Sequence, residues 1–223
     1  TREQILFRFT GVRPLASSMA KSTGQYSRDH HIEVLSGEQT KLSFPVYSLV
    51  GGKWTSFRAF SELTADKAFE HLGVKRTKDT RSLAIGGGRG YPLNADDMQR
   101  QIESLSAWTG VTRERLRGLF ERYGTRAEAV ATFMNGGTDR FLHTLPDYSL
   151  RELFFIVTHE KVFHLDDFIL RRSMLAMLGR LSREMLDELA GVFANALGWT
   201  KEQRQAEVAR TLSILADRHN VQL

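Results

Sequence analysis

The sequence predicts an α+β fold, in which short antiparallel strands and one helix precede an all-helical domain. Three observations predict it. Apolar and polar residues alternate over Ile5–Thr10, as in a half-buried strand. Residues 74–93 are polar and glycine-rich, like a linker. From Asn94 onward apolar residues recur every three or four positions, as on amphipathic helices. We therefore expect domains at residues 1–73 and 94–223, joined by the linker 74–93.

The first domain is predicted to hold two or three strands, namely Ile5–Thr10, a hairpin partner around His31–Leu35, and Lys41–Val50. Pro45 lacks an N–H and is tolerated near the start of a strand. Thr55 or Ser56 can then cap a helix over residues 55–72, and Gly73 ends it.

The second domain is predicted to be helical throughout. Its helices are Asp96–Trp108, Thr112–Tyr123, Thr125–Met134, Ser149–Glu160, Leu165–Leu178, Ser182–Leu197 and Thr200–His219. Good N-caps stand at Asn94, Thr112, Ser149 and Thr200, the last followed by Glu202. Glycines supply the stops at positions 110, 124, 136, 179 and 198.

Composition limits the class of protein. At 223 residues with 41% hydrophobic content, the chain can bury a core. The absence of cysteine excludes disulfides and thiolate metal sites, and it suits a reducing cytosol. No apolar run reaches the ~18–20 residues of a membrane span. The net charge of +5 is modest and does not by itself indicate an anionic partner.

The stretch Leu49-Val-Gly-Gly-Lys-Trp-Thr-Ser-Phe-Arg58 predicts a seat for an anion. Here a strand enters a helix through Gly51 and Gly52, which allow backbone angles and close approaches that a Cβ forbids. The first N–H groups of a helix lack internal partners and carry about half a positive charge, and Lys53 adds a whole one. The alternative interpretation is an ordinary strand–turn–helix with a surface lysine.

A second segment predicts a phosphate clamp. Gly11 ends the first strand, and Pro14 forces Arg13 into an extended conformation. A guanidinium held at a strand end can bind two phosphate oxygens at once. Most arginines after strands merely face solvent, so this segment becomes informative only together with the anion seat.

Three motifs taken together resemble the FAD-dependent glycerol-3-phosphate dehydrogenases. They are Gly11-Val-Arg-Pro-Leu15, Ser27-Arg-Asp-His30 and Gly51-Gly-Lys-Trp-Thr-Ser-Phe-Arg58, in this order. Thr158-His-Glu160 followed by Leu165–Arg172 resembles the acidic-then-Arg-Arg signature of that family's helical C-terminal domain. The resemblance runs from about Phe9 to the last helix. It implies the end of a flavoprotein FAD/substrate domain followed by an all-helical C-terminal domain.

The resemblance implies oxidation of glycerol 3-phosphate, or a related polyol phosphate, to the ketone dihydroxyacetone phosphate with hydride transfer to FAD. The family binds FAD through a glycine-rich turn, G-x-G-x-x-G, which this sequence lacks. The nearest stretch, Ile85–Tyr91, reads as linker. We therefore interpret the chain as a C-terminal fragment that is inactive alone and needs the N-terminal FAD-binding part of the same protein.

The resemblance also assigns roles to individual residues. Arg13 would hold the substrate phosphate, and Lys53 would lie near both the substrate and the flavin. Backbone N–H groups facing the flavin would come from Gly51, Gly52, Trp54 and Thr55. The commoner family sequence after the lysine has a tyrosine where this chain has Phe57, so any hydrogen bond from that hydroxyl is in doubt.

The resemblance leaves several properties open. Family members pass electrons to quinone at a membrane surface or to oxygen. A cytoplasmic location is expected, with peripheral attachment to the inner face of the cell membrane as an alternative. Pairing into a homodimer is a further alternative.

Two other sets of residues could act in the site. Arg58 in the first helical turn opposes the helix dipole, so we expect it to have a carboxylate partner and a structural role. His30 and His31 could act as general base, but one of two adjacent strand residues must point away from the site. The family resemblance places the base outside this chain.

A cluster of histidines and acids invites a metal interpretation, but its spacing does not fit the one-turn zinc motif. Its members are His159, Glu160, His164, Asp166 and Asp167. We expect a packing network instead, with an Asp167–Arg171 pair on one helix and a tie between Glu160 and Arg172, and no metal site.

A rival interpretation from another class is a basic helical module that binds nucleic acid or a protein partner. It rests on the arginines at positions 113, 115, 117, 122 and 126. Glu114, Glu121 and Glu128 interrupt these arginines, as on an ordinary solvated face. We therefore expect no nucleic-acid partner.

Overall fold

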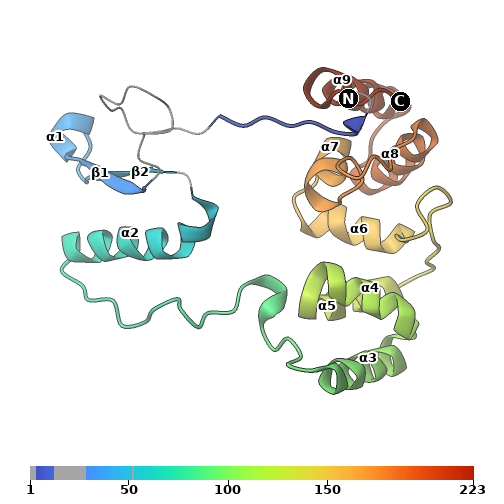
Figure 1. Ribbon diagram of the computed structural model, residues 1–223, viewed down its shortest axis with the longest axis horizontal. Helices are drawn as coiled ribbons and strands as arrows, with labels where there is room; N and C mark the ends of the chain where they lie inside the picture. The colour runs from blue at the N-terminus through green and yellow to red at the C-terminus, as the bar shows by residue number, and fades with distance from the viewer. Residues whose placement is uncertain (1–3, 13–28, 52) are drawn as a thin grey trace. The chain divides into compact units, whose positions relative to one another are not determined.

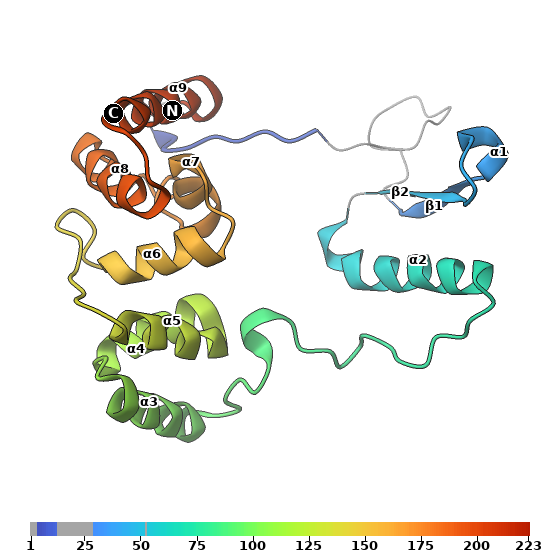
Figure 2. The same cartoon turned by 180° about the vertical axis from the view of Figure 1, so that it is seen from behind.

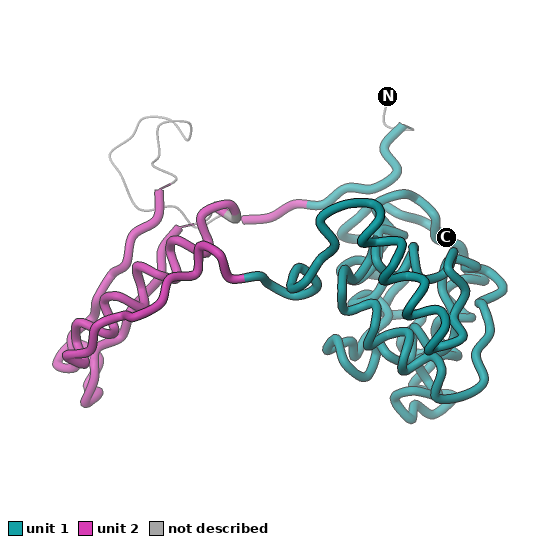
Figure 3. The backbone as a smooth tube through the Cα atoms, turned by 90° about the horizontal axis from the view of Figure 1, so that it is seen from below, with its two compact units in different colours: residues 1–9, 84–223 teal, residues 10–83 magenta. Residues whose placement is uncertain are grey.

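The computed structural model describes residues 4–12, 29–51 and 53–223 (Figure 1). The chain divides into two compact units, which Figure 3 colours separately: residues 10–83, and residues 1–9 together with 84–223. Within the described residues no helix is long and apolar enough to cross a membrane. The predicted domain boundaries stay a prediction.

The smaller unit contains one antiparallel strand pair and one long helix. Strand β1 (His31–Leu35) pairs with β2 (Val46–Val50), so that His31 lies opposite Val50. The predicted strand at 31–35 is confirmed, whereas the one at 41–50 begins only at Val46. Lys41 adopts the left-handed conformation after the short helix α1 (Gly37–Thr40), and this breaks the strand.

Ile5–Thr10 is not a strand, contrary to the prediction. Apolar alternation makes a segment suitable for a sheet edge, but a strand exists only where a second strand supplies hydrogen bonds. Among the described residues β1 pairs with β2 instead. Residues 5–9 therefore run without regular structure and are held by other contacts.

Helix α2 (Phe57–His71) follows a short 3₁₀ turn, η3 (Trp54–Ser56), and lies along the strand pair (Figures 1 and 2). The rings of His30 and Phe60 lie 4.5 Å apart, and the Tyr47 hydroxyl donates to the Lys67 carbonyl at 3.3 Å. Every residue from position 29 to 83 whose exposure the structure describes is exposed or half-buried. Apolar side chains such as Phe44, which is 56% exposed, remain in contact with solvent.

The larger unit is helical, as predicted. It comprises η4 (Gly86–Gly88), α3 (Ala95–Thr109), α4 (Arg113–Tyr123), η5 (Gly124–Arg126), α5 (Ala127–Asn135), α6 (Leu150–His159), α7 (Leu165–Asp167), the π-helix η6 (Phe168–Arg172), α8 (Arg183–Leu197) and α9 (Lys201–His219). The predicted caps Asn94, Thr112, Ser149 and Thr200 each accept an N–H of the first turn. At Thr200 the capping partner is Gln203 rather than Glu202.

One predicted helix is shorter than expected. The pattern over 165–178 gives α7 and then η6, which ends at Arg172. Ser173 is extended, with φ −143°, and its hydroxyl donates to the Phe168 carbonyl at 3.0 Å. A side chain that competes for a helical carbonyl in this way favours the end of the helix.

Two hydrophobic clusters form the core of the helical unit. One joins α3, α4 and α5 around Leu116, Leu119 and Val130. The other joins α6 to α9 around Leu153, Phe168 and Phe193. Phe155 of α6 packs into the first cluster, so the two layers of helices share a boundary.

A fully buried carboxylate joins these two layers. Glu152 of α6 is 0% exposed and accepts hydrogen bonds from Arg115, Arg122 and Tyr123 of α4. The Arg122 Nε and Tyr123 hydroxyl lie 3.1 Å and 2.7 Å from Glu152 Oε1. Both arginines also donate to the Asp147 carbonyl. These additional hydrogen bonds offset part of the cost of burying the charges, although Arg115 Nε has no partner among the described residues.

The surroundings of Glu152 also shift the ionisation of its partners. Burial lowers the pKa of the Arg115 guanidinium. Burial acts the same way on Arg122, but the Glu152 charge, the interactions with Tyr148 and Tyr123 and the hydrogen bond to Glu152 together outweigh it and raise that pKa. Burial and the Glu152 charge both raise the pKa of the Tyr123 hydroxyl, which therefore stays protonated and donates.

A second network ties α7 to α9. Glu207 of α9 accepts the Leu165 N–H and His164 Nδ1, each at 3.0 Å. Arg210 bridges Glu207 and Asp166, with Nη1 2.6 Å from Asp166 Oδ1 and 2.9 Å from Glu207 Oε1. Burial raises the pKa of the Asp166 carboxyl, but hydrogen bonds and charge from Arg210 and Arg171 outweigh it and hold the pKa below its usual value.

The glycine-rich stretch before α3 is packed rather than free. A Cβ on Gly87 would lie 2.0 Å from the Tyr123 carbonyl oxygen, and one on Gly124 would lie 2.4 Å from the Gly87 oxygen. The Thr125 hydroxyl donates to the Gly87 carbonyl at 3.1 Å. The glycines therefore allow two backbone segments to touch. This close contact accounts for the run of glycines, and no nucleotide-binding turn is needed to explain it.

We predict that Glu152→Ala lowers the free energy of unfolding by about 3–5 kcal/mol, because it leaves the largely buried guanidinium of Arg115 and the partly buried one of Arg122 without their carboxylate. Chemical denaturation monitored by circular dichroism measures this. Glu121→Ala, an exposed change on α4, is the control and should stay within about 0.5 kcal/mol. Equal effects of the two substitutions would contradict the structural role of Glu152.

We predict that Asp166 contributes to the acid sensitivity of the fold. Its folded-state pKa lies below the reference value of 3.8, so its contribution is present above about pH 4 and is lost as the pH falls through the folded-state pKa. In Asp166→Asn, the free energy of unfolding should depend less steeply on pH below 4, by at most about 1.4 kcal/mol per unit. Arg210→Gln removes a main cause of the lowered pKa of Asp166, so the free energy of unfolding of this variant should also depend less steeply on pH below 4. An unchanged slope in both variants would refute the prediction.

Candidate functional site

The predicted anion seat is the junction between β2 and α2. Gly51 follows β2 directly with φ 142°, a conformation that favours glycine. A Cβ there would lie 2.7 Å from the His30 Cα. The prediction that glycine allows a close backbone approach is therefore confirmed at Gly51. Gly52 lies outside the described residues.

The helix start differs from the prediction in a way that matters for ligands. Neither Thr55 nor Ser56 caps α2, because Ser56 stands at the N-cap without a side-chain cap bond. Its hydroxyl instead donates to the Lys53 carbonyl at 3.2 Å, as does its N–H. The first turn of α2 also contains no acidic residue. The positive end of this helix is therefore not neutralised by a side chain of its own.

Lys53 stands directly before this helix start. Its side chain is exposed and forms no ion pair with any described residue. Trp54 and Thr55 form the 3₁₀ turn between the lysine and α2. Arg13 lies outside the described residues, so its predicted convergence with Lys53 stays a prediction.

Arg58 has the expected structural role but not the expected partner. Instead of a carboxylate, its Nη1 donates to the carbonyls of Thr80 at 2.5 Å and Leu83 at 2.8 Å. Glu62, one turn further along α2, accepts the Thr80 N–H and hydroxyl. Hydrogen bonds from Thr80 lower the pKa of Glu62. The helix that carries the anion seat is thus fixed to the segment that follows it.

The two candidate bases have different surroundings. The His30 side chain is 20% exposed and its ring packs on Phe60, while His31 is exposed. His30 Nδ1 lies 3.7 Å from Asp29 Oδ1. The contact with Phe60 directs His30 toward α2. A general base outside this chain stays the prediction.

The acidic cluster is a packing network in the structure. The Asp167–Arg171 pair at 2.9 Å and the Glu160–Arg172 pair at 3.8 Å are both present, as predicted. His164, Asp166 and Glu207 do lie close enough to share an ion. Their carboxylates, however, already hold two guanidinium groups. Sequence reasoning missed Glu207, because only folding brings α9 beside α7.

The predicted arginine stripe is not a continuous surface. Arg115 and Arg122 point into the Glu152 cluster. Arg117 donates to Gln99 at 2.9 Å, and Arg126 pairs with Glu160 at 3.2 Å. Most of the positive charge that suggested a nucleic-acid module is therefore used inside the helical unit.

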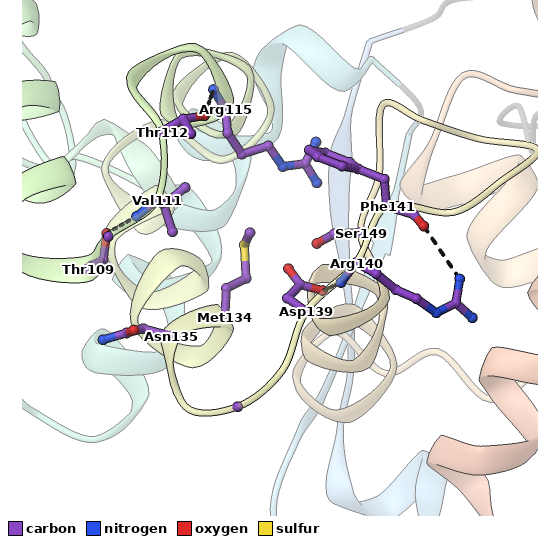
Figure 4. A pocket seen from close by; sticks show the side chains of 12 residues that line it. Thr109, Val111, Thr112, Arg115, Met134, Asn135, Asp139, Arg140, Phe141 and Ser149 are labelled. Carbon is purple, nitrogen blue, oxygen red and sulfur yellow. Dashed lines mark hydrogen bonds between the residues drawn. The ribbon is translucent and has the colours of Figure 1, made fainter.

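A separate pocket of about 330 Å³ lies in the helical unit between the ends of α3 and α5 and the start of α4 (Figure 4). Its walls include Met134, Asp139, Phe141 and the guanidinium of Arg115, which lies 5.2 Å from the Phe141 ring centre. Asp139 Oδ1 accepts the backbone N–H groups of residues 140 and 151. None of the predicted site residues lies in this pocket.

Comparison with known proteins matches the helical part of the chain to a family. The family model for the C-terminal domain of alpha-glycerophosphate oxidase matches residues 78–204, which is more than half of the chain.

Curated relatives match nearly the whole chain. A probable glycerol-3-phosphate dehydrogenase of Encephalitozoon cuniculi is 26% identical over 100% of this chain and 35% of its own length. A glycerol-3-phosphate dehydrogenase of Synechocystis is 27% identical over 94% of this chain and 37% of its own. The chain thus spans about a third of the length of these relatives.

A solved structure shares the fold. The glycerol-3-phosphate dehydrogenase of Bacillus halodurans, complexed with FAD, aligns with a TM-score of 0.62 and 22% identity. The alignment covers 82% of this chain and 37% of that one. These matches confirm the resemblance that the motifs predicted, and the chain belongs to the family of alpha-glycerophosphate oxidase C-terminal domains.

Proposed function

We propose that this chain is the C-terminal part of a FAD-dependent glycerol-3-phosphate dehydrogenase. The whole protein oxidises glycerol 3-phosphate, or a related polyol phosphate, to dihydroxyacetone phosphate. FAD, when bound, supplies the acceptor for the hydride. The residues of this chain bind the substrate phosphate and place positive charge beside the reacting centre. The uncapped start of α2 behind Lys53 is the observation that carries this proposal.

The anion seat suits a group that gains negative charge during the reaction. The first N–H groups of α2 have no side-chain acceptor among the described residues, and no acidic side chain opposes them. An exposed ammonium stands directly before them at Lys53. Fixed donors of this kind stabilise a developing anion because they need no rearrangement when the charge appears.

The residues present fit one edge of a flavin rather than its whole site. Gly51 keeps the backbone free of side-chain bulk beside His30, as a flat ring system near the chain requires. The N–H groups of Gly51, Gly52, Trp54 and Thr55 would face the flavin, and Lys53 would lie between flavin and substrate. The main nucleotide-binding turn belongs to the N-terminal part of the longer protein, which is therefore the partner of this chain.

The smaller unit supports the same conclusion from its packing. Every residue in it whose exposure the structure describes is exposed or half-buried, and Phe44, Phe57 and Leu72 are 56%, 55% and 68% exposed. A two-stranded hairpin with one helix is at best marginally stable without further cover. The proposed longer protein would cover these apolar side chains. The fragment is accordingly inactive by itself.

The proposal allows two electron acceptors, quinone and oxygen. Quinone reduction goes with a cytoplasmic protein attached to the inner face of the cell membrane, and oxygen reduction needs no such attachment. Fractionation of the longer protein with membrane vesicles separates these routes. Sedimentation equilibrium tests the homodimer that the family resemblance left open.

We predict that Arg13→Ala in the longer protein lowers kcat/KM for glycerol 3-phosphate by roughly 10- to 150-fold, mainly through KM, because a charge-assisted pair with the phosphate is lost. Steady-state kinetics with a dye as electron acceptor measure this. Arg13→Lys keeps the charge but loses the bidentate contact, so its kcat/KM should lie between that of the unchanged protein and that of Arg13→Ala. Unchanged kinetics would show that the clamp lies elsewhere.

We predict that Lys53→Met slows flavin reduction by roughly 100-fold, because a fixed positive group is lost where negative charge develops. Stopped-flow absorbance of the flavin in the longer protein measures this step directly. Lys53→Arg retains the charge and should recover much of the rate. A normal rate of flavin reduction in Lys53→Met would exclude the anion seat from the reaction.

A further inference from the structure

The pocket shown in Figure 4 has no part in the proposed function. Its volume of about 330 Å³ lies in the roughly 300–1,000 Å³ range of small-molecule sites. Every residue that lines it falls between positions 109 and 149, so all of its walls come from the helical unit. What the pocket can bind therefore follows from this unit alone.

Asp139 offers the pocket a hydrogen-bond acceptor. Its Oδ1 already accepts the backbone N–H groups of Arg140 and Arg151, each at 2.9 Å. Its other oxygen, Oδ2, points toward the middle of the lining side chains (Figure 4) and accepts no hydrogen bond from a described residue. A ligand N–H or O–H that reached this oxygen would form a charge-assisted hydrogen bond.

Two donors in the pocket wall lack an acceptor. The Ser149 hydroxyl accepts the Glu152 N–H at 3.4 Å as the N-cap of α6, but no described residue accepts its own proton. Arg115, whose side chain is 9% exposed, donates from Nη1 to the Asp147 carbonyl and from Nη2 to Glu152. Its buried Nε has no partner among the described residues. A buried donor without an acceptor is costly, so an oxygen supplied by a ligand would be favoured here.

The remaining walls are apolar. Val111 and Met134 lie on one side of the pocket, and the Phe141 ring lies over the Arg115 guanidinium on the other (Figure 4). Phe141 is 56% exposed, and exposed side chains change rotamer quickly, so its ring can move to admit a group to Arg115 Nε. These walls suit the hydrocarbon body of a ligand whose polar head lies at Asp139.

The charges of the wall decide the head group of the ligand. An anionic head would meet the Asp139 carboxylate, and a cationic head would meet the Arg115 guanidinium. A primary carboxamide is neutral, and it has N–H donors for Asp139 and a carbonyl oxygen whose two lone pairs suit the two donors. We propose that this pocket binds a small neutral carboxamide with an apolar body. The inference is independent of the proposed function, because it uses none of the residues assigned to the reaction.

Three probes of similar size and different charge test this proposal, namely benzamide, benzoate and benzylammonium. The methionine methyl groups of the 223-residue chain carry an isotope label, and NMR follows the Met134 methyl signal. Benzamide should shift this signal in a saturable way with a Kd of about 1 mM, as expected for a ligand of so few atoms. Benzoate and benzylammonium should bind roughly 10-fold more weakly, because each brings a charge to a group of the same sign. No saturable shift with benzamide, or tighter binding of either charged probe, would overturn the proposal.

Two variants locate the binding and test its contacts. Val111→Phe places a ring in the pocket and should weaken benzamide binding by roughly 10-fold, whereas Val74→Phe, the same change at a 53% exposed position of the smaller unit, is the control without effect. Asp139→Asn keeps an oxygen for the backbone N–H groups of residues 140 and 151 but turns an amide N–H toward the pocket, so the preference should reverse toward benzoate. Circular dichroism checks that each variant is folded. Equal benzamide binding in the two valine variants, or an unchanged order of probes in folded Asp139→Asn, would overturn the proposal.

Discussion

The helical unit depends on the burial of one carboxylate. Glu152 lies where α4 meets α6, and without it the guanidinium groups of Arg115 and Arg122, whose side chains are 9% and 25% exposed, would lose their carboxylate at the boundary of the two layers. Coulomb attraction alone does not make such a pair favourable, because removing the charges from water costs several kcal/mol per ion. The Asp147 carbonyl accepts from both arginines and the Tyr123 hydroxyl donates to Glu152, while Arg115 Nε is left without a partner among the described residues. The network therefore specifies which face of α4 meets α6, where apolar contacts alone would tolerate a rotation.

The smaller unit, unlike the helical unit, is held together mainly by local contacts near the surface. It contains a regular hairpin and a 15-residue helix, yet every residue in it whose exposure the structure describes is exposed or half-buried. Its contacts are polar and local, such as those from Arg58 and Glu62 to Thr80. Local contacts can hold the hairpin and α2 together, but they do not supply the hydrophobic stabilisation that a domain needs. Under the proposed function, the rest of a longer protein would cover these apolar side chains, and the chain spans about a third of the length of the relatives it matches.

Local chemistry was predictable from the sequence, and long-range pairing was not. The caps at Asn94, Thr112 and Ser149 follow from side chains that reach their own helix within three residues. Glu207 joins Leu165 across 42 positions, and no spacing rule connects them. The strand predicted at Ile5–Thr10 failed for the same reason, because alternation shows suitability for a sheet but not the presence of a neighbour.

In the candidate site, the sequence likewise predicted which residue types are present but not the contacts that they make. The hydroxyl of Ser56 is of the right type and in the right place to cap α2, yet it donates to the Lys53 carbonyl. Giving up a cap costs a helix about 1 kcal/mol. The contact instead closes the turn that carries Lys53 and leaves the start of α2 without a side-chain cap. A helix of a protein whose stability is supplied elsewhere can bear this loss, and binding of an anion at its start would return the missing stabilisation.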